Sequence, residues 1–281
     1  MAEILKGKPV ADAIKSDIAV RAERLKAAGR KPLLAVMRAG ERQDDIAYEN
    51  RVIRNCSEVG IETVNVTFPA DVAHDTFTDA LKGLSGDRSV HGILVLRPLP
   101  QQVNSDEAGF LIDPRKDVDC MNPENLRKVF MGDAAGIAPC TPEAVIEILK
   151  FYGHEIRGKN VVIINRSLVL GRPLAMLFLA EDATVTVCHS RTEKLAEITS
   201  GADILVSGVG KPEYFGKESV SPYMTVIDVG INFTEKGMCG DMRYDEVCDV
   251  VSAISPVPGG VGTVTSAILL RHLIESAEFG I

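Results

Sequence analysis

The sequence predicts an α/β protein whose parallel sheets are covered by helices on both faces. Short aliphatic segments of buried-strand length alternate with helical segments along the chain, which is the pattern of βαβ units. Trp is absent and aromatic residues make up 5%, so the core must be aliphatic. A length of 281 residues allows one large domain or two modest ones.

The first half of the chain alternates helix and strand. Apolar residues at helical spacing after Pro9 predict a helix over 8–28, which Gly29 ends. We expect strands at 32–37, 61–68 and 90–96, and helices at 43–59 and 73–84. Residues 97–142 are rich in Pro, Asn, Asp and Gly, which predicts a long loop and a crossing between domains.

The second half opens with a helix from Thr141, the expected N-cap, through Pro142 at the first helical position to Tyr152. Further strands are expected at 160–164, 183–188, 204–210 and 225–230, with helices at 174–180, at 195–199 and from Ser266. This close succession of strand and helix is typical of a nucleotide-binding α/β unit.

Composition excludes several classes of protein. The 31 basic and 39 acidic residues give a net charge of −8, so we expect no nucleic-acid partner. No apolar run approaches the roughly 18–20 residues of a membrane span, and the N-terminal segment lacks the apolar centre of a signal peptide. The six cysteines show no metal-ligand spacing and fit a reducing cytosol. We expect a cytoplasmic protein with no metal and no membrane partner.

The turn at 165–173 is a candidate phosphate site. A strand that leads into a helix N-terminus presents free N–H groups and a positive dipole end to a pyrophosphate. Of the usual Gly-x-Gly-x-x-Gly pattern only Gly171 is present, with Asn165 and Ser167 nearby. A plain structural turn is an equally good interpretation.

The end of the second strand bears on the type of cofactor. An acidic residue there binds a free ribose 2′-hydroxyl, whereas a cation suits a 2′-phosphate. Residues 188–192 contain no acid, and Arg166, Ser190 and Arg191 are suited to a phosphate. NADP is therefore favoured over NAD. The alternative interpretation is that these residues belong to an ordinary solvated loop that contacts no cofactor.

The segment 256–265 carries two prolines and three glycines before a helix. Such a loop can fold tightly over a flat ligand, although a strained connector is the alternative.

These segments together resemble the methylenetetrahydrofolate dehydrogenase/cyclohydrolase family. The matching stretches, in the family's order, are Gly92-Ile-Leu-Val95, Pro98-Leu-Pro100, Lys116-Asp-Val-Asp119, Pro139-Cys-Thr-Pro142, Asn165-Arg-Ser167, Gly171-Arg-Pro173, Ala183-Thr-Val-Thr186, Cys188-His-Ser190, Asp228-Val-Gly-Ile-Asn232 and Pro256-Val-Pro-Gly-Gly-Val-Gly262. The resemblance implies a homodimer. It also implies a folate-binding domain at 1–140, completed by helix 264–281, a Rossmann-like NAD(P) domain at 141–263, and a cleft between them.

The resemblance also implies the site residues. Tyr48 would stack on the folate and Asp119 would bind the pterin, as the catalytic pair for a tetrahydrofolate derivative. Further substrate contacts are expected from Pro98, Leu99, Pro258, Gly259 and Gly260. Cofactor contacts are expected from Asn165, Arg166, Ser167, Gly171, Arg172, Pro173, His189, Ser190, Arg191, Gly208, Gly230, Ile231 and Thr265.

Departures from the family pattern bear on activity. Val52 stands where the family has the Lys of the cyclohydrolase step, and Leu96 replaces the Gln of Val-Gln-Leu-Pro-Leu-Pro that supports it. Cys120 replaces a Gly, Thr263 a Pro, and Asn165 a position that is usually Gly in the bifunctional enzymes.

The two activities of the family make different demands. Hydride transfer needs two rings held face to face, whereas hydrolysis of the methenyl product needs a positioned acid/base. Val52 and Leu96 cannot move protons, and the guanidinium groups of Arg51 and Arg54 do not deprotonate near neutral pH. We therefore expect a dehydrogenase whose cyclohydrolase activity is weak or lost.

Three alternatives stay open. The chain could be a full bifunctional enzyme with a substitute acid/base, a non-catalytic folate- or nucleotide-binding protein, or an unrelated oxidoreductase on the same plan.

Overall fold

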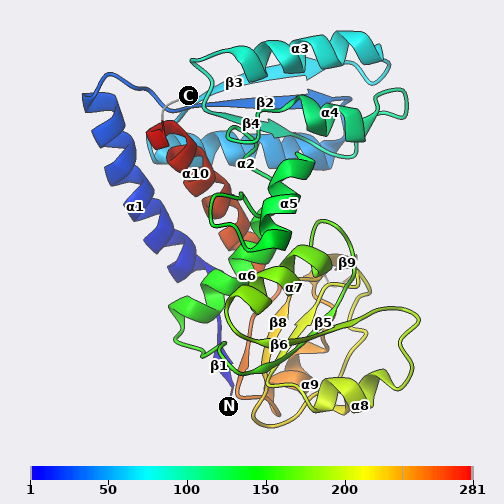
Figure 1. Cartoon of the computed structure of the whole chain (residues 1–281). Helices are drawn as coiled ribbons and strands as arrows, with labels where there is room; N and C mark the ends of the chain where they lie inside the picture. Colours follow the sequence, from blue (N-terminus) through cyan, green and yellow to red (C-terminus); the bar gives the residue numbers. More distant parts are fainter. Residues whose placement is uncertain (1, 236, 280–281) are drawn as a thin grey trace. The chain divides into compact units, whose positions relative to one another are not determined.

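The computed structural model describes residues 2–235 and 237–279, and these form two compact units (Figure 1). Residues 2–12 and 141–265 make up the large-sheet unit, and residues 13–140 and 266–279 the small-sheet unit. The predicted domain 1–140 includes residues 1–12 together with the residues of the small-sheet unit. The described part of that segment groups with the large sheet because its short strand pairs there.

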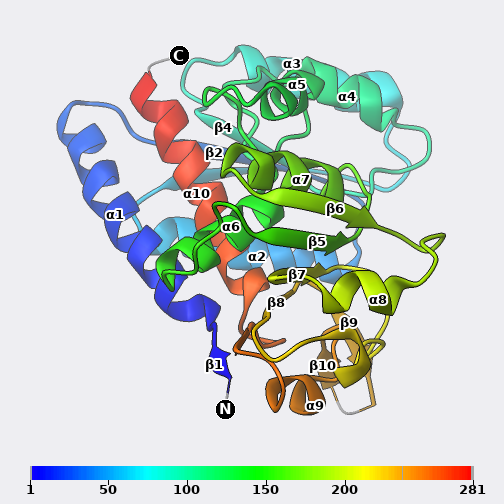
Figure 2. The same cartoon turned by 60° about the horizontal axis from the view of Figure 1, so that its bottom comes forward.

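The large-sheet unit is built on six parallel strands. In sheet order they are β1 (Glu3–Ile4), β11 (Ala253–Ile254), β8 (Thr225–Asp228), β7 (Ile204–Ser207), β5 (Asn160–Ile164) and β6 (Thr184–Cys188). The helices are α6 (Cys140–Phe151), α7 (Gly171–Ala180), α8 (Leu195–Ser200), α9 (Tyr244–Cys248) and a 3-10 turn at Lys217–Ser219. They lie on both faces of the sheet (Figure 2). A hairpin, β9 (Asn232–Thr234) with β10 (Gly237–Cys239), lies apart from the sheet.

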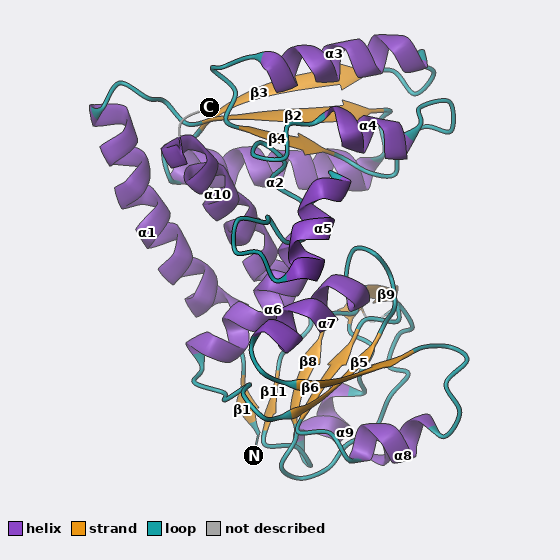
Figure 3. Ribbon diagram, in the orientation of Figure 1, coloured by secondary structure: helices purple, strands orange, loops and turns teal. Residues whose placement is uncertain are grey.

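The small-sheet unit has three parallel strands in the order β3 (Glu62–Phe68), β2 (Leu33–Ala39) and β4 (Gly92–Val95). Its helices are α2 (Gln43–Glu58), α3 (His74–Gly86), α4 (Ser105–Leu111) and α5 (Pro123–Met131). Helix α3 lies on one side of the sheet and α2 on the other (Figure 3). Helices α1 (Gly7–Ala27) and α10 (Val261–Phe279) contribute residues to both units.

The parallel sheets and the aliphatic core are confirmed. Strands β4, β5, β7 and β8 are almost wholly buried, as expected for strands covered on both faces. None of the described helices combines the length and apolar character needed to cross a membrane.

The prediction of one long loop over 97–142 is wrong, because helices α4 and α5 lie inside it. Asn104 and Asn122 cap them: the Asn104 side chain accepts the N–H groups of Asp106 and Glu107, and Asn122 accepts that of Glu124. Both residues look like turn formers in the sequence, but an Asn before a helix satisfies its first amides.

The N-cap predicted at Thr141 is also wrong, since α6 already begins at Cys140. The short elements β1, β9, β10, β11 and α9 were not predicted, because two to five residues are too few to show a hydrophobic period.

Candidate functional site

The carboxyl ends of four neighbouring strands form one edge of the large sheet. Strand pairing sets Ile164 opposite both Cys188 and Ser207, and sets Ser207 opposite Asp228. The predicted cofactor residues that follow these strands, from Asn165, His189, Gly208 and Gly230 onward, therefore leave the sheet at the same edge. Strands β5 and β7 are adjacent although β6 separates them in sequence, which makes this edge a topological switch point, the usual ligand site of such sheets.

The Asn165 side chain organises the turn between β5 and α7. Its Oδ1 accepts hydrogen bonds from the Ser167 amide at 2.8 Å, the Ser167 hydroxyl at 2.8 Å and the Gly171 amide at 3.0 Å. Its Nδ2 donates to the carbonyl of Gly208 on the neighbouring strand end. Because these bonds engage both the oxygen and the nitrogen of the amide, Asn165 shapes the cofactor turn.

Gly171 is needed at the start of α7 for close packing. A Cβ there would lie 1.9 Å from the Asn165 carbonyl oxygen, so a side chain would push the helix away from the strand. Pro173 is buried in the first turn of the same helix. This is the role that glycine plays in the dinucleotide fingerprint.

Three arginines lie on the segments that follow β5 and β6. Arg166, Arg172 and Arg191 are exposed, and within the described residues their guanidinium groups form no ion pair. The loop that carries Arg191 is held by His189, whose Nδ1 accepts the Arg191 amide at 3.1 Å. Ser190 is exposed beside them. The edge can therefore bind an anionic group through basic side chains.

Three further predicted cofactor residues are either exposed or make a local hydrogen bond. Ile231 is 57% exposed, and the Thr265 hydroxyl donates to the Gly262 carbonyl in the first turns of α10. The Gly230 amide donates to Asp228 at 2.9 Å.

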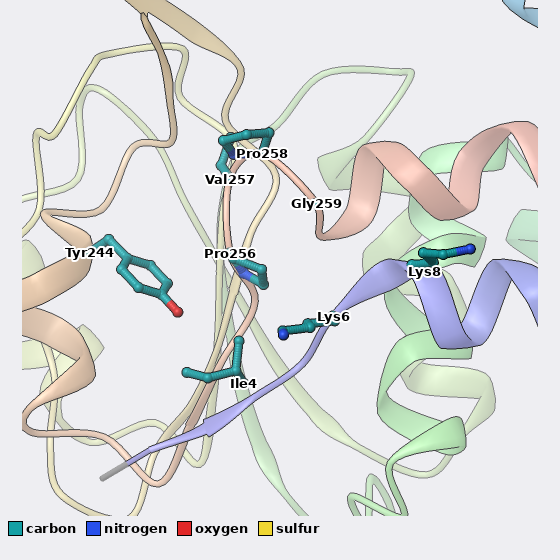
Figure 4. A pocket seen from close by; sticks show the side chains of 8 residues that line it. All are labelled: Ile4, Lys6, Lys8, Tyr244, Pro256, Val257, Pro258 and Gly259. Atoms are coloured by element: carbon teal, nitrogen blue, oxygen red, sulfur yellow. The ribbon is translucent and has the colours of Figure 1, made fainter. Parts of the chain in front are cut away.

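Residues 256–259 form one wall of a cavity of about 530 Å³ in the large-sheet unit. Gly259 has a φ of +100°, which glycine adopts without strain, and its carbonyl accepts the Gly7 amide at 2.7 Å. Lys6 and Tyr244 extend toward each other across the cavity beside Pro256 (Figure 4). Pro258 and Gly259 are exposed and Gly260 is buried, so Pro258 and Gly259 can touch a ligand directly.

In the small-sheet unit, Tyr48 and Asp119 belong to one cluster of polar side chains. Burial raises the pKa of the Tyr48 hydroxyl above its usual range, and the nearby negative charge of Asp119 raises it further. The guanidinium of Arg51 lies 5.3 Å from the centre of the Tyr48 ring. Arg97, which follows β4, pairs with Asp119 at 3.3 Å.

The turn after Asp119 is built on a buried carboxylate. Asp117 accepts the amides of Met121 and Asn122, each at 2.8 Å, and this fixes the chain on both sides of Asp119. Cys120 has a φ of +55°, in the left-handed region that favours glycine. That conformation gives a physical reason for the family's Gly at this position.

The two positions where the family resemblance leads us to expect a Lys and its partner Gln are apolar and buried. Val52 on α2 is 2% exposed and Leu96 after β4 is 6% exposed. Leu99 packs against the core of the unit, whereas Pro98 is exposed. Neither Val52 nor Leu96 supplies a group that could exchange a proton.

A buried Cys–His pair was not foreseen from the sequence. His272 on α10 lies 2.9 Å from the Val118 carbonyl through Nδ1, and the Cys140 Sγ is 3.9 Å from the same nitrogen. Cys140 also affects Tyr48, since its charge when ionised would raise the Tyr48 pKa. The described residues include no cluster of His, Cys, Asp and Glu that could hold a metal.

The sequence analysis also did not predict that Arg97 and Arg51 would lie beside Tyr48 and Asp119. Arg97 could have been found, because it stands where the family stretch Val-Gln-Leu-Pro-Leu-Pro has an apolar residue. The Cys140–His272 pair had no signal, since 132 positions separate its members.

The sheet topology, the switch-point edge and the glycine-backed turn define the large-sheet unit as a dinucleotide-binding α/β unit. A model of the tetrahydrofolate dehydrogenase/cyclohydrolase catalytic domain matches residues 5–119, and a model of that family's NAD(P)-binding domain matches residues 139–280. The chain belongs to the tetrahydrofolate dehydrogenase/cyclohydrolase family, the oxidoreductases of one-carbon folate metabolism.

Individual relatives match this chain over nearly its whole length. The chain is 46% identical to the bifunctional protein FolD of Clostridium botulinum, covering 99% of both sequences. It superposes on the bifunctional FolD structure from Campylobacter jejuni with a TM-score of 0.98 at 35% identity, covering 100% of both chains. The Trypanosoma brucei FolD structure, complexed with NADP cofactor and inhibitor, gives a TM-score of 0.92 at 33% identity, covering 99% and 98% of the two chains.

Proposed function

We propose that this protein oxidises 5,10-methylenetetrahydrofolate to the 5,10-methenyl form by hydride transfer to NAD(P), and that its cyclohydrolase activity is weak or absent. The observation that carries the proposal is the contrast within the small-sheet unit. Tyr48 and Asp119 belong to one polar cluster, while Val52 and Leu96 are buried and apolar.

The dehydrogenase step does not require a side chain of the protein to donate or accept a proton. The nicotinamide accepts the hydride when it is bound, and a folate nitrogen lone pair stabilises the cation that forms. The chain's own residues hold the substrate: Tyr48 stacks on it and Asp119 accepts from the pterin amino and ring N–H groups. Pro98, Leu99 and the loop Pro258–Gly260 supply further substrate contacts in this proposal.

Hydrolysis of the methenyl product is the step that this site serves poorly. Water must lose a proton and a ring nitrogen must gain one, for which a positioned acid/base contributes a rate factor of about 10²–10⁴. Arg51 lies over the Tyr48 ring, but its guanidinium does not release a proton near neutral pH. The Tyr48 hydroxyl keeps its proton because its pKa is raised.

NADP is the favoured cofactor, with NAD as the alternative. The exposed guanidinium groups of Arg166 and Arg191 suit a 2′-phosphate, and the loop at 188–192 offers no carboxylate to a free ribose. The ordered Asn165 turn and the N-terminus of α7 suit the pyrophosphate. A homodimer and a cytoplasmic location belong to the same proposal.

Two assays on the purified chain test this function. Methylenetetrahydrofolate with NADP or NAD should give reduced cofactor and methenyl product. With the enzyme but no cofactor, methenyltetrahydrofolate should be hydrolysed at close to its rate in buffer without enzyme. Failure of cofactor reduction would refute the dehydrogenase assignment, while rapid enzyme-dependent hydrolysis would refute the loss of cyclohydrolase activity.

One observation favours the full bifunctional enzyme as a second candidate. Cys140 and His272 form a buried thiol–imidazole pair in the small-sheet unit, and an imidazole can move protons near neutral pH. The Nδ1 of His272 is engaged by the Val118 carbonyl at 2.9 Å, which limits it as a base. If hydrolysis is found, His272→Gln should abolish it under this alternative and leave hydride transfer in place.

A further inference from the structure

The ion pair between Arg97 and Asp119 is placed where it could recognise a ligand. Nη2 of Arg97 lies 3.3 Å from Oδ2 of Asp119, and the two side chains are 32% and 33% exposed. Across the described residues, Asp119 is the one hydrogen-bond partner of this guanidinium. Several of its five N–H donors are therefore available to a bound molecule.

The local backbone brings the two residues to the same end of the small sheet. Residues 116–119 run parallel to β4, since Ile93 and Asp117 form a parallel bridge and the Ile93 amide donates to the Lys116 carbonyl at 2.7 Å. Arg97 follows β4 by two residues, and Asp119 follows Asp117 by two. The side chains thus meet because two extended segments end together.

Stability does not account for this pair. A partly exposed ion pair contributes little to folding, because both charges lose favourable hydration and conformational freedom. Arg97 also occupies a position that is Leu in the family stretch quoted above, so the charge is not required for this backbone.

The edge of a pterin ring carries a matching pattern of groups. The 2-amino and N3–H groups are donors and suit a carboxylate, while the neighbouring 4-oxo oxygen is an acceptor and suits a guanidinium. A carboxylate beside a guanidinium therefore complements the whole edge, with charge-assisted hydrogen bonds on both sides.

We propose that Arg97 is a specificity-determining residue that donates to the 4-oxo oxygen of the pterin, so that the Arg97–Asp119 pair selects 4-oxo pterins over 4-amino pterins. This inference rests on the proposed function, which assigns Asp119 to the pterin. A 4-amino group presents donors to Arg97 in place of an acceptor, and the guanidinium charge disfavours the more basic diaminopteridine ring.

Folic acid and its 4-amino counterpart, aminopterin, test the inference because they differ only in the 4-substituent and the N3–H that accompanies the 4-oxo form. The N3–H faces Asp119, which the parent and every variant keep, so a change in preference between them reports on position 97. Their dissociation constants are measured with the chain of 281 residues in the presence of NADP, for the parent protein and for Arg97→Leu, Arg97→Lys and Arg127→Leu. Arg127 is the matched control, since it is 57% exposed and pairs with Glu124 on α5. Thermal unfolding of each variant confirms that it is folded, and Arg97→Lys keeps the positive charge if the Leu variant is unstable.

The parent should bind folic acid at least about tenfold more tightly than aminopterin, and Arg97→Leu should lose about tenfold or more in folic acid affinity alone. Arg97→Lys should retain part of the preference, and Arg127→Leu all of it. KM for methylenetetrahydrofolate should rise in Arg97→Leu with little change in kcat.

The outcomes separate this inference from the proposed function. Turnover of methylenetetrahydrofolate with an unchanged preference in Arg97→Leu would overturn the role of Arg97 alone. An equal loss of affinity for folic acid and aminopterin would also overturn it, because a general charge effect does not distinguish a 4-oxo group from a 4-amino group. A parent protein that neither binds nor oxidises folates would overturn both.

Discussion

The main-chain amide of Asp241 donates a hydrogen bond of 3.1 Å to the carboxylate of Asp228, and the side chains of both residues are buried. Asp241 in turn accepts the Ser207 hydroxyl at 3.0 Å and the Val209 amide at 2.6 Å. This network ties the ends of β7 and β8 to the segment at 240–242. The two carboxylates therefore help to shape the edge assigned to the cofactor.

The first prediction concerns pH and Asp228. Burial raises the pKa of this carboxyl from 3.8 to about 6, and the charge of Asp241 adds to the rise. Between these values the folded chain holds a proton that the unfolded chain has released. This contribution to stability is therefore present at low pH and is lost as pH rises from about 4 to about 6, by up to about 3 kcal/mol.

Urea unfolding of the parent and of Asp228→Asn across this pH range measures the effect. The variant lacks the titrating group, so the stability of the parent relative to the variant should fall toward pH 6. The variant should be less stable overall at low pH, because its amide cannot accept both the Gly230 and Met242 amides. Parallel stability profiles would contradict the raised pKa.

The second prediction restores proton transfer to the small-sheet unit. Val52→Lys combined with Leu96→Gln should raise methenyltetrahydrofolate hydrolysis about tenfold or more, because an amine held by an amide can exchange protons with water. The rate of methenyl loss, corrected for buffer, is the measurement. Thermal stability should decrease, since Val52 is 2% exposed and a lysine there is desolvated.

Val52→Met with Leu96→Met is the matched control. It changes both side chains without adding a titratable group, so it should leave hydrolysis at the parent's rate. Equal gains in the two double variants would show that repacking, and not the lysine, causes the change.

The sequence predicted the repeating architecture better than the contacts within the site. Aliphatic strands such as 160–164 and 204–207 show their burial in their composition, because almost all of their residues are covered by helices on the two faces of the sheet. The helices after Asn104 and Asn122 were missed because the same residue type serves turns and N-caps. No feature of the sequence indicated that the Asn165 side chain would bond both to its own turn and to the carbonyl of Gly208, since the second contact depends on the neighbouring strand end.

The third prediction concerns cofactor choice. Arg191→Ala should raise KM for NADP about tenfold and leave KM for NAD almost unchanged, because a charge-assisted hydrogen bond to the 2′-phosphate is lost. Steady-state kinetics with both cofactors measure the split. Arg157→Ala is the control: Arg157 precedes β5, and its guanidinium pairs with Asp182 at 2.8 Å. An equal effect of Arg191→Ala on both cofactors would refute a contact with the 2′-phosphate.

The last prediction concerns the residue next to Tyr48. Glu49 on α2 is 5% exposed; its Oε2 accepts from Nε of Arg38 on β2 at 2.6 Å, and its Oε1 accepts from Asn65 on β3 at 2.9 Å. These bonds hold α2 against two strands of the small sheet. They therefore help to set the position of Tyr48.

Glu49→Gln should lower the free energy of unfolding by about 3 kcal/mol, because it leaves the charge of Arg38, whose side chain is only 14% exposed, without a counter-ion. KM for methylenetetrahydrofolate should rise with it, since Tyr48 loses its anchored neighbour. Replacing both Arg38 and Glu49 by Leu removes the pair without leaving an unpaired charge, so the double variant should be more stable than Glu49→Gln. Urea unfolding ranks the three proteins. A Glu49→Gln variant as stable as the parent would show that the pair does not anchor α2.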